Sequence, residues 1–286
     1  MSAAWTALQQ GGTALDAVEA GARAVEDNPD DHTVGFAGHP NIDGIVELDA
    51  SIMDGTTRRA GAVGGLRGYR HAITVARAVM DSTPHALITG EGAARLAAAI
   101  GEPADNLLTD QESERWAAGI EDGKADLLSQ VRLLTHDPRE GAGTVDFIAL
   151  DSAGQLASAV STSGWAFKYP GRLADSAIIG AGNYCDDRYG AAACTGWGEL
   201  AIRASTAHTA VQAMARGASP AEAAEIAMRD LFDLPTGGIL PMMFIVVLSP
   251  SGEHAAATTV PEGARYAWQD ESTNGLVIAE RTVVRP

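Results

Sequence analysis

A threonine that opens a β-branched run is the first candidate for chemistry in this sequence. Gly143 and Thr144 precede Val145, where a stretch rich in acids ends in glycine. A threonine hydroxyl is a weak nucleophile near neutral pH and needs an adjacent base. If the bond between Gly143 and Thr144 were cut, the freed α-amine of Thr144, whose ordinary pKa is near ~8, could take the proton as the hydroxyl attacks a carbonyl. The same pattern also fits an ordinary turn before a strand.

Two further pairs of residues could recognise and activate a substrate. Arg172 and Asp175 lie three positions apart in a bend with proline and glycine, so the guanidinium could hold a carboxylate and the carboxylate an ammonium. Thr195 and Gly196 end a run of small residues just before a predicted helix, so a hydroxyl and an N–H could face a developing oxyanion. A surface ion pair and a helix-capping turn are the structural alternatives.

Several other kinds of site are not indicated. The sequence contains no dinucleotide-binding glycine motif, Walker loop, nucleophile elbow or His-Glu-x-x-His. Its seven histidines never fall at ligand spacing, so we expect no metal and no cofactor. Cys185 and Cys194 match neither a disulfide framework nor a zinc site, which favours a reducing, cytoplasmic location.

Charge and hydropathy also limit the partners. Lysine and arginine number 20 against 37 acids, a formal net charge of −17 that would repel phosphate backbones, so no nucleic acid is expected. The longest apolar run, 239–248, contains Pro241 and is far shorter than the ~20 residues that span a bilayer, so no membrane contact is expected. Residues 1–5 lead directly into a helical pattern, and we expect no signal peptide.

The elements that must position these residues follow from periodicity and turn signals. Helices are expected at 13–26, 66–80, 198–218 and 220–232, and strands at 34–38, 45–53, 84–89, 144–150, 156–161, 240–248, 255–260 and 276–279. Strands and helices come in blocks, which favours antiparallel sheets covered by helix layers over a doubly wound parallel sheet. Residues 101–143 carry ten acids against four bases and predict an acidic, flexible connector.

Taken together, these segments resemble the glycosylasparaginase and isoaspartyl peptidase family, the asparaginase branch of the N-terminal-nucleophile hydrolases. Ordered blocks across nearly the whole chain carry the resemblance. They are Gly11–Glu19, Val34-Gly35-Phe36 with Gly38, Glu47–Gly55, Gly61-Ala62-Val63, Val75-Ala76-Arg77, Gly90-Glu91, and the segments from Thr144 to Glu199 described above.

The resemblance implies an α+β fold, a four-layer αββα sandwich with two antiparallel sheets between helix layers. Residues 1–286 would form a single domain, made as a precursor that cuts itself before the nucleophile. The α subunit would be 1–143, with the connector 101–143 as its tail, and the β subunit 144–286. A homodimer of such autocleaved αβ units is the expected assembly.

The resemblance also implies the role of each site residue. The reaction would be hydrolysis of the β-amide of a small aspartyl substrate, without a cofactor. Thr144 would be the nucleophile and its amine the base, Thr162 a hydroxyl that orients it, Arg172 and Asp175 the holders of the α-carboxylate and α-amine, and Thr195 and the Gly196 N–H the oxyanion hole.

Three departures from the family pattern bear on activity. Bacterial glycosylasparaginases usually have aspartate directly before the nucleophile, whereas this chain has Gly143. A glycine at this position resembles the isoaspartyl peptidase branch. Asp146 stands where glycine is usual and could clash with substrate, raise the pKa of the Thr144 amine or slow self-cleavage. The opening strand is missing and Trp5 belongs to the following helix, so we expect a bare sheet edge and an open pocket wall.

Three functions therefore remain open. Residues 34–40 and 166–168 favour a glycosylasparaginase-type amidohydrolase. The Gly143-Thr144 junction supports the alternative of an isoaspartyl dipeptidase or L-asparaginase. Asp146 and the short N-terminus support a third, a non-processing relative that binds an aspartyl ligand without catalysis or serves as an assembly partner.

Overall fold

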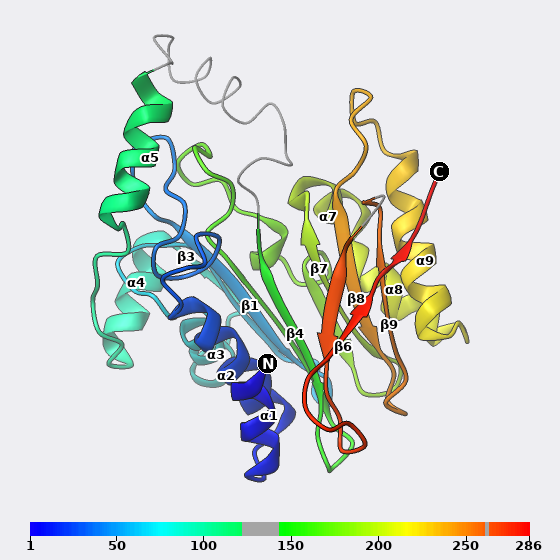
Figure 1. Cartoon of the computed structure of the whole chain (residues 1–286). Coiled ribbons are helices and arrows are strands. Elements are labelled where there is room, and N and C mark those ends of the chain that lie inside the picture. The colour runs from blue at the N-terminus through cyan, green and yellow to red at the C-terminus, as the bar shows by residue number, and fades with distance from the viewer. Residues whose placement is uncertain (122–142, 261–262) are drawn as a thin grey trace.

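The computed structural model describes residues 1–121, 143–260 and 263–286. Its centre is a pair of five-stranded sheets packed face to face (Figure 1). In spatial order the first sheet is β3 (Leu87–Thr89), β2 (Ala60–Leu66), β1 (Leu48–Asp54), β5 (Leu156–Thr162) and β4 (Val145–Leu150). The second is β12 (Thr282–Val283), β9 (His254–Thr258), β8 (Met243–Leu248), β7 (Gly190–Gly196) and β6 (Asn183–Asp186).

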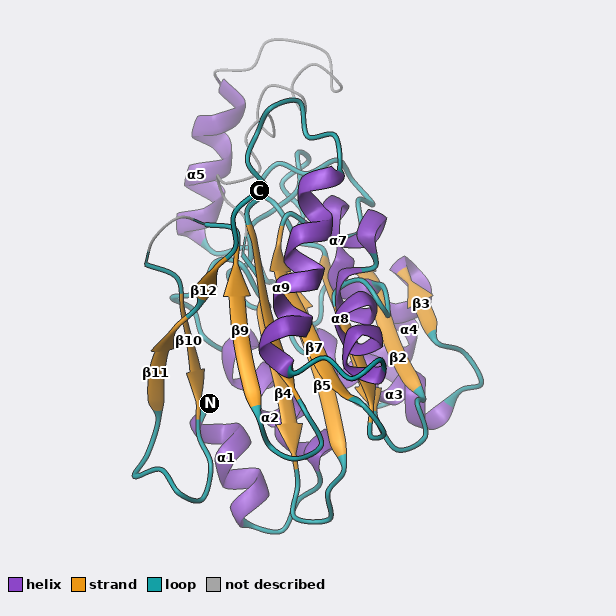
Figure 2. Ribbon diagram, turned by 90° about the vertical axis from the view of Figure 1, so that its right-hand side faces the viewer, coloured by secondary structure: helices purple, strands orange, loops and turns teal. Residues whose placement is uncertain are grey.

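Helices cover the outer face of each sheet (Figure 2). On the first sheet lie α2 (Ala14–Glu26), α3 (Ala72–Ser82) and α4 (Gly90–Ala99), and α1 (Ser2–Gln9) packs on α2. On the second lie α8 (Thr206–Ala215) and α9 (Pro220–Asp230), preceded by α7 (Gly198–Ala204). This arrangement confirms the four-layer αββα fold. The strand pairs are antiparallel except β2 with β3 and β12 with β9, which are parallel.

The two sheets approach closely because their facing strands carry small side chains. Ala191 and Ala193 of β7 are fully buried, and the buried Ser158 of β5 donates a hydrogen bond of 3.0 Å to Oδ1 of Asn183 on β6. Val145 at the start of β4 pairs with Ser161 near the end of β5. The start of β4 and the ends of β5 and β7 therefore meet at one end of the sandwich, where the candidate residues lie.

Local signals explain where two of the helices begin. Thr13 caps α2 by accepting a hydrogen bond from the Asp16 N–H, and the Asp16 side chain bonds back to the Thr13 N–H. Ser219 and Glu222 make the same reciprocal pair at the start of α9. Each pair satisfies N–H groups that have no partner within the helix.

Some sequence-based expectations were wrong in detail. Residues 34–38 form turns rather than a strand, since Gly35 and Ala37 have φ of 59° and 61°, outside the extended region. The glycine-containing residues 60–66 instead form β2, and α3 begins at Ala72 rather than near 66. The helix expected over 198–218 breaks at Ser205, whose φ is 49°.

The acidic segment after residue 101 contains an ordered helix, α5 (Asp110–Glu121). Glu112 is buried on this helix and accepts a hydrogen bond from His39 Nδ1 at 2.7 Å. The Trp116 indole N–H donates to the Ile42 carbonyl at 3.1 Å. The remainder of the predicted connector, 122–142, lies outside the described residues.

Strand β4 forms one edge of its sheet. A cavity of about 1010 Å³ lies beside this edge, lined by Trp5 of α1, by β4, and by the hairpin of β10 (Arg265–Trp268) and β11 (Val277–Glu280). Among the helices that the structure describes, none combines the length and apolar composition that crossing a bilayer requires.

Candidate active site

Gly143 and Thr144 lie directly before β4, opposite Thr162 at the end of β5. The Thr162 hydroxyl donates a hydrogen bond of 2.7 Å to the carbonyl oxygen of Gly143, the carbonyl of the predicted scissile bond. It also accepts the Gly164 N–H at 2.9 Å. The Thr162 hydroxyl is thus held between the Gly164 N–H and the Gly143 carbonyl.

Gly143 sits in a space that admits no side chain. A Cβ at this position would overlap the side chain of Thr33. The Thr33 hydroxyl in turn donates to Asp31 at 2.7 Å, which fixes it. A larger residue before Thr144 would therefore push the junction away from Thr162.

One small pocket gathers most of the predicted site residues. Its lining is Gly143, Thr144, Thr162, Gly164, Trp165, Arg172, Ala174, Asp175 and Gly196. Thr195 is the one predicted residue absent from that lining, although it precedes Gly196 on β7. The open volume is about 10 Å³, about what one water molecule needs. The pocket therefore has no room for a substrate, and Gly143 forms part of its wall.

At Gly196 the backbone of β7 closely approaches the backbone of Met242. Its φ is 122°, a conformation that residues with a side chain rarely adopt, and a Cβ there would overlap the carbonyl oxygen of Met242. The strand consequently ends with its backbone, rather than a side chain, against the pocket.

Arg172 and Asp175 each bring an unused polar atom to this pocket. Arg172 Nε and Nη2 donate to the two carboxylate oxygens of Glu199 at 2.9 and 2.8 Å, and the guanidinium lies over the Trp165 ring at 4.8 Å. Arg172 Nη1 and Asp175 Oδ2 are both buried and have no hydrogen-bond partner. Buried donors and acceptors are rarely left unpaired, so the pair indicates a ligand that supplies an acceptor and a donor.

Burial also shifts the titration of Asp175. Removal from water raises the pKa of this carboxyl to about 7, the Arg172 charge opposes the shift and the Glu199 charge adds to it. The carboxyl therefore changes charge close to neutral pH.

A buried polar scaffold that the sequence analysis missed holds this loop. Lys168, fully buried, donates to the Glu47 carbonyl at 3.0 Å, and the Glu47 side chain accepts the Gly171 N–H at 3.1 Å. Asp49 accepts the N–H groups of Gly65 and Ala174 at 2.9 Å each, which ties β1 to the residue before Asp175. The signal available in the sequence was a pair of acids, Glu47 directly before β1 and Asp49 within this otherwise apolar, buried segment.

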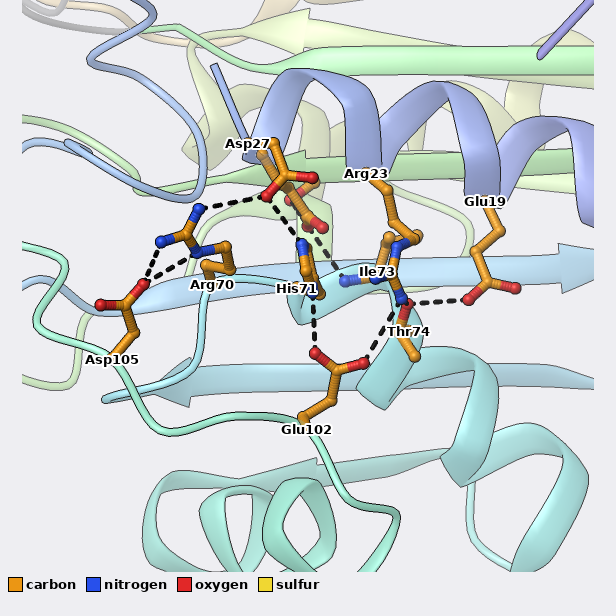
Figure 3. A network of polar contacts seen from close by, with 11 residues as sticks. Glu19, Arg23, Asp27, Arg70, His71, Ile73, Thr74, Glu102 and Asp105 are labelled. Carbon is orange, nitrogen blue, oxygen red and sulfur yellow. Dashed lines mark hydrogen bonds and ion pairs between the residues drawn. The ribbon is translucent and has the colours of Figure 1, made fainter. Parts of the chain in front are cut away.

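A second polar network joins elements of the helix layer that covers the first sheet (Figure 3). His71, at the start of α3, contacts Asp27 Oδ1 at 2.9 Å and Glu102 Oε2 at 2.7 Å. Arg70 joins Asp27 to Asp105 in the same network. These contacts fasten α2, α3 and the chain around 102–105 together, and they lie outside the pocket.

Glu26 links that layer to the strand that carries Thr162. Its Oε1 accepts the Ser161 hydroxyl at 2.6 Å and the Ile73 N–H at 3.0 Å. Burial raises the pKa of Glu26 to about 8, so the group is mostly protonated at neutral pH. These contacts fix the end of β5 relative to α2 and α3.

Asp146 belongs to the large cavity beside β4 and does not line the small pocket. Its carboxyl is buried, Oδ2 has no hydrogen-bond partner, and burial raises its pKa to about 6, with the Arg281 charge opposing the shift. A clash between this carboxylate and a ligand in the small pocket is therefore not supported by the lining.

Other nucleophiles and metal sites are not apparent in the described chain. Cys185 and Cys194 are buried free thiols whose pKa burial raises well above the usual value. Within 1–121, 143–260 and 263–286, no group of three or more His, Cys, Asp or Glu side chains is arranged to hold a metal ion.

The layered fold and this site define an amidohydrolase of the N-terminal-nucleophile class. Residues 1–278 match the family model described as Asparaginase, so the chain belongs to the asparaginase family. It is 37% identical over 284 residues to the N(4)-(β-N-acetylglucosaminyl)-L-asparaginase of Elizabethkingia miricola, an alignment that covers 96% of this chain and 78% of that protein. Two mammalian relatives are equally similar. The rat protein of the same name is 38% identical, covering 78% of this chain and 71% of its own, and the bovine isoaspartyl peptidase/L-asparaginase is 38% identical, covering 88% and 79%.

Proposed function

We propose that this chain cleaves itself between Gly143 and Thr144 and then hydrolyses the β-amide of an aspartyl substrate through Thr144. The observation that carries the proposal is the joint placement, in one pocket, of this junction, of Thr162 on its carbonyl, and of the unpaired Arg172 Nη1 and Asp175 Oδ2. The chain would then act in two stages at the same residues.

In the first stage the Thr144 hydroxyl attacks the Gly143 carbonyl carbon. The peptide C–N bond breaks, the hydroxyl proton passes to the amine, and an ester forms. Water hydrolyses this ester, which leaves a carboxylate on Gly143 and a free α-amine on Thr144. Thr162, which donates to the Gly143 oxygen, stabilises the charge that develops there. Departure of the Gly143 end enlarges a pocket that otherwise holds about one water molecule.

In the second stage Arg172 holds the α-carboxylate of the substrate and Asp175 its ammonium. The Thr144 α-amine accepts the hydroxyl proton as Oγ attacks the β-carbonyl carbon, and Thr195 and the Gly196 N–H stabilise the oxyanion. The proton then leaves on the amine product as the C–N bond breaks. Water hydrolyses the β-aspartyl ester, releasing aspartate and restoring Thr144.

A glycosylated asparagine is the substrate we favour, because the N(4)-(β-N-acetylglucosaminyl)-L-asparaginase of Elizabethkingia miricola aligns with 96% of this chain. The second candidate is an isoaspartyl dipeptide or asparagine, supported by the equally similar bovine relative and by the Gly143-Thr144 junction. We also propose a homodimer of cleaved αβ units in the cytoplasm, supported by the two buried free cysteines for the location and by the family pattern for the assembly.

A denaturing gel followed over time tests the first stage. The chain of 29.5 kDa should give two fragments that divide at Gly143, and N-terminal sequencing of the second should begin at Thr144. Thr144→Ala should give one band and no turnover, whereas Thr144→Ser should keep both activities in part. A single wild-type band that persists on incubation would refute self-cleavage, and turnover by Thr144→Ala would refute the nucleophile. Comparing product release from glycosylasparagine, a β-aspartyl dipeptide and asparagine distinguishes the two candidate substrates.

A further inference from the structure

Arg172 is held by a carboxylate that none of the predicted roles uses. Glu199, in the first turn of α7, takes both Nε and Nη2 of the guanidinium in a two-point contact. The Glu199 side chain is 43% exposed and that of Arg172 14%. An ion pair with one half-exposed partner contributes little to stability by itself. We therefore ask how the pair affects the position of the Arg172 guanidinium.

The surroundings of the guanidinium leave it one free direction. One edge faces Glu199 and one face lies over Trp165, whereas Nη1 is buried without a partner. Arginine presents its donors in a rigid planar fork, so fixing one edge also fixes where the remaining nitrogen points. Nη1 is therefore offered to the pocket that Arg172 lines.

Asp175 lines the same pocket as Arg172. Both residues are described by the structure, and they form no ion pair with each other. Their charges nevertheless affect each other, because the arginine opposes the rise in the pKa of Asp175. A buried carboxylate and a nearby guanidinium ordinarily pair, which would satisfy both and close the site. The contact to Glu199 is what occupies the arginine instead.

We propose that Glu199 is a positioning residue that holds Arg172 away from Asp175, so that both charges stay available for the two charged groups of an α-amino acid. The identity of that ligand, an aspartyl moiety, rests on the proposed function. The separation itself does not. Without Glu199 the guanidinium swings onto Asp175, and the protein pairs internally the two groups that should recognise substrate.

Glu199→Gln tests this idea, with Glu225→Gln as the matched control. Glu225 also pairs with an arginine, Arg229, but at an exposed i, i+4 position on α9. The Glu199→Gln substitution removes the charge and should raise the KM for an aspartyl β-amide about tenfold while kcat changes much less, because the loss is one of binding. Self-cleavage should continue at the wild-type rate, which shows that the variant is folded.

The pH dependence of kcat/KM reports the charges that face Asp175. The charges that bear on Asp175 are Arg172, Glu199 and Asp49. Direct contact with Arg172, together with loss of the Glu199 charge, lowers the pKa of Asp175. The rise of kcat/KM with pH should therefore move to lower pH in Glu199→Gln and stay in place in Glu225→Gln. Equal KM values and equal pH profiles in all three proteins would overturn the proposal.

Crystal structures of the wild type and of Glu199→Gln separate this proposal from the proposed function. An Arg172 to Asp175 ion pair in the variant alone is the expected result, whether or not either protein turns over substrate. Arg172 unmoved in the variant, or already paired with Asp175 in the wild type, would overturn the role of Glu199. An inactive, uncleaved wild type with the predicted movement would instead refute only the proposed function.

Discussion

Replacing Asp146 with asparagine is expected to stabilise the folded chain near neutral pH and to have little such effect in acid. The carboxyl is buried at the β4 edge, Oδ2 lacks a partner, and burial raises its pKa from 3.8 to about 6 while Arg281 compensates only in part. The unfolded chain loses this proton near pH 4, whereas the folded chain keeps it until about pH 6. Stability therefore falls as pH rises between these values, and the full cost remains above them.

The size of the effect follows from the shift. About two pKa units correspond to about 3 kcal/mol of unfolding free energy above pH 6, and to nothing below pH 4. Asparagine has no proton to lose, although its buried amide also needs partners, which adds an offset that does not vary with pH. The quantity to compare is thus the difference in melting temperature between variant and wild type, which should grow by roughly 5–10 °C from pH 4 to pH 7.

Differential scanning fluorimetry in the Thr144→Ala background keeps the chain in one piece for this comparison. Asp270→Asn is the matched control with the opposite sign. Asp270 is exposed and accepts hydrogen bonds from Ser272, which lower its pKa, so its replacement should not stabilise at neutral pH. A difference between Asp146→Asn and wild type that is constant from pH 4 to pH 7 would refute the reasoning about burial.

Three further changes test the site itself. Thr162→Val removes the donor to the Gly143 carbonyl and should slow self-cleavage by about 100-fold on a timed gel, whereas Thr162→Ser should stay near wild type. Gly196→Ala, at a φ of 122° and against a backbone carbonyl, should cost more than about 2 kcal/mol in urea unfolding, and an unchanged midpoint would contradict the predicted overlap. Calorimetric affinity for L-aspartate should rise with pH through about 7 as Asp175 ionises, and Asp175→Asn should show weak binding that no longer varies there.

The sequence analysis predicted best where the information lies within a few residues. The helix predicted over 13–26 and the strands predicted over 144–150 and 156–161 depend on neighbours in the chain, and the structure contains all three. The predicted roles at Thr144, Arg172 and Asp175 stay predictions, yet their placement in one pocket agrees with them.

The errors fall where distant packing overrides local preference. Residues 60–66 contain three glycines and lack a strand signal, yet they form β2, which pairs with β1 and β3. Glycine is needed here because α3 lies so close that a Cβ at Gly61 would overlap the Ala76 carbonyl. The start of the acidic connector becomes α5 because His39 and Ile42, some 70 residues earlier, supply partners for Glu112 and Trp116. Neither contact can be inferred from the residues within a few positions of either partner.

The order of motifs along the chain was enough to determine the family, the fold class and the residues to suspect, since each motif is a short run with its own chemistry. Only the tertiary structure decided which atoms of those residues are free. The Glu199 contact across 27 positions engages Nε and Nη2 of Arg172 while Nη1 stays unpaired, and burial moves the pKa values of Asp146 and Asp175. Desolvation and pairing depend on what surrounds a group in space, and sequence separation carries no record of that.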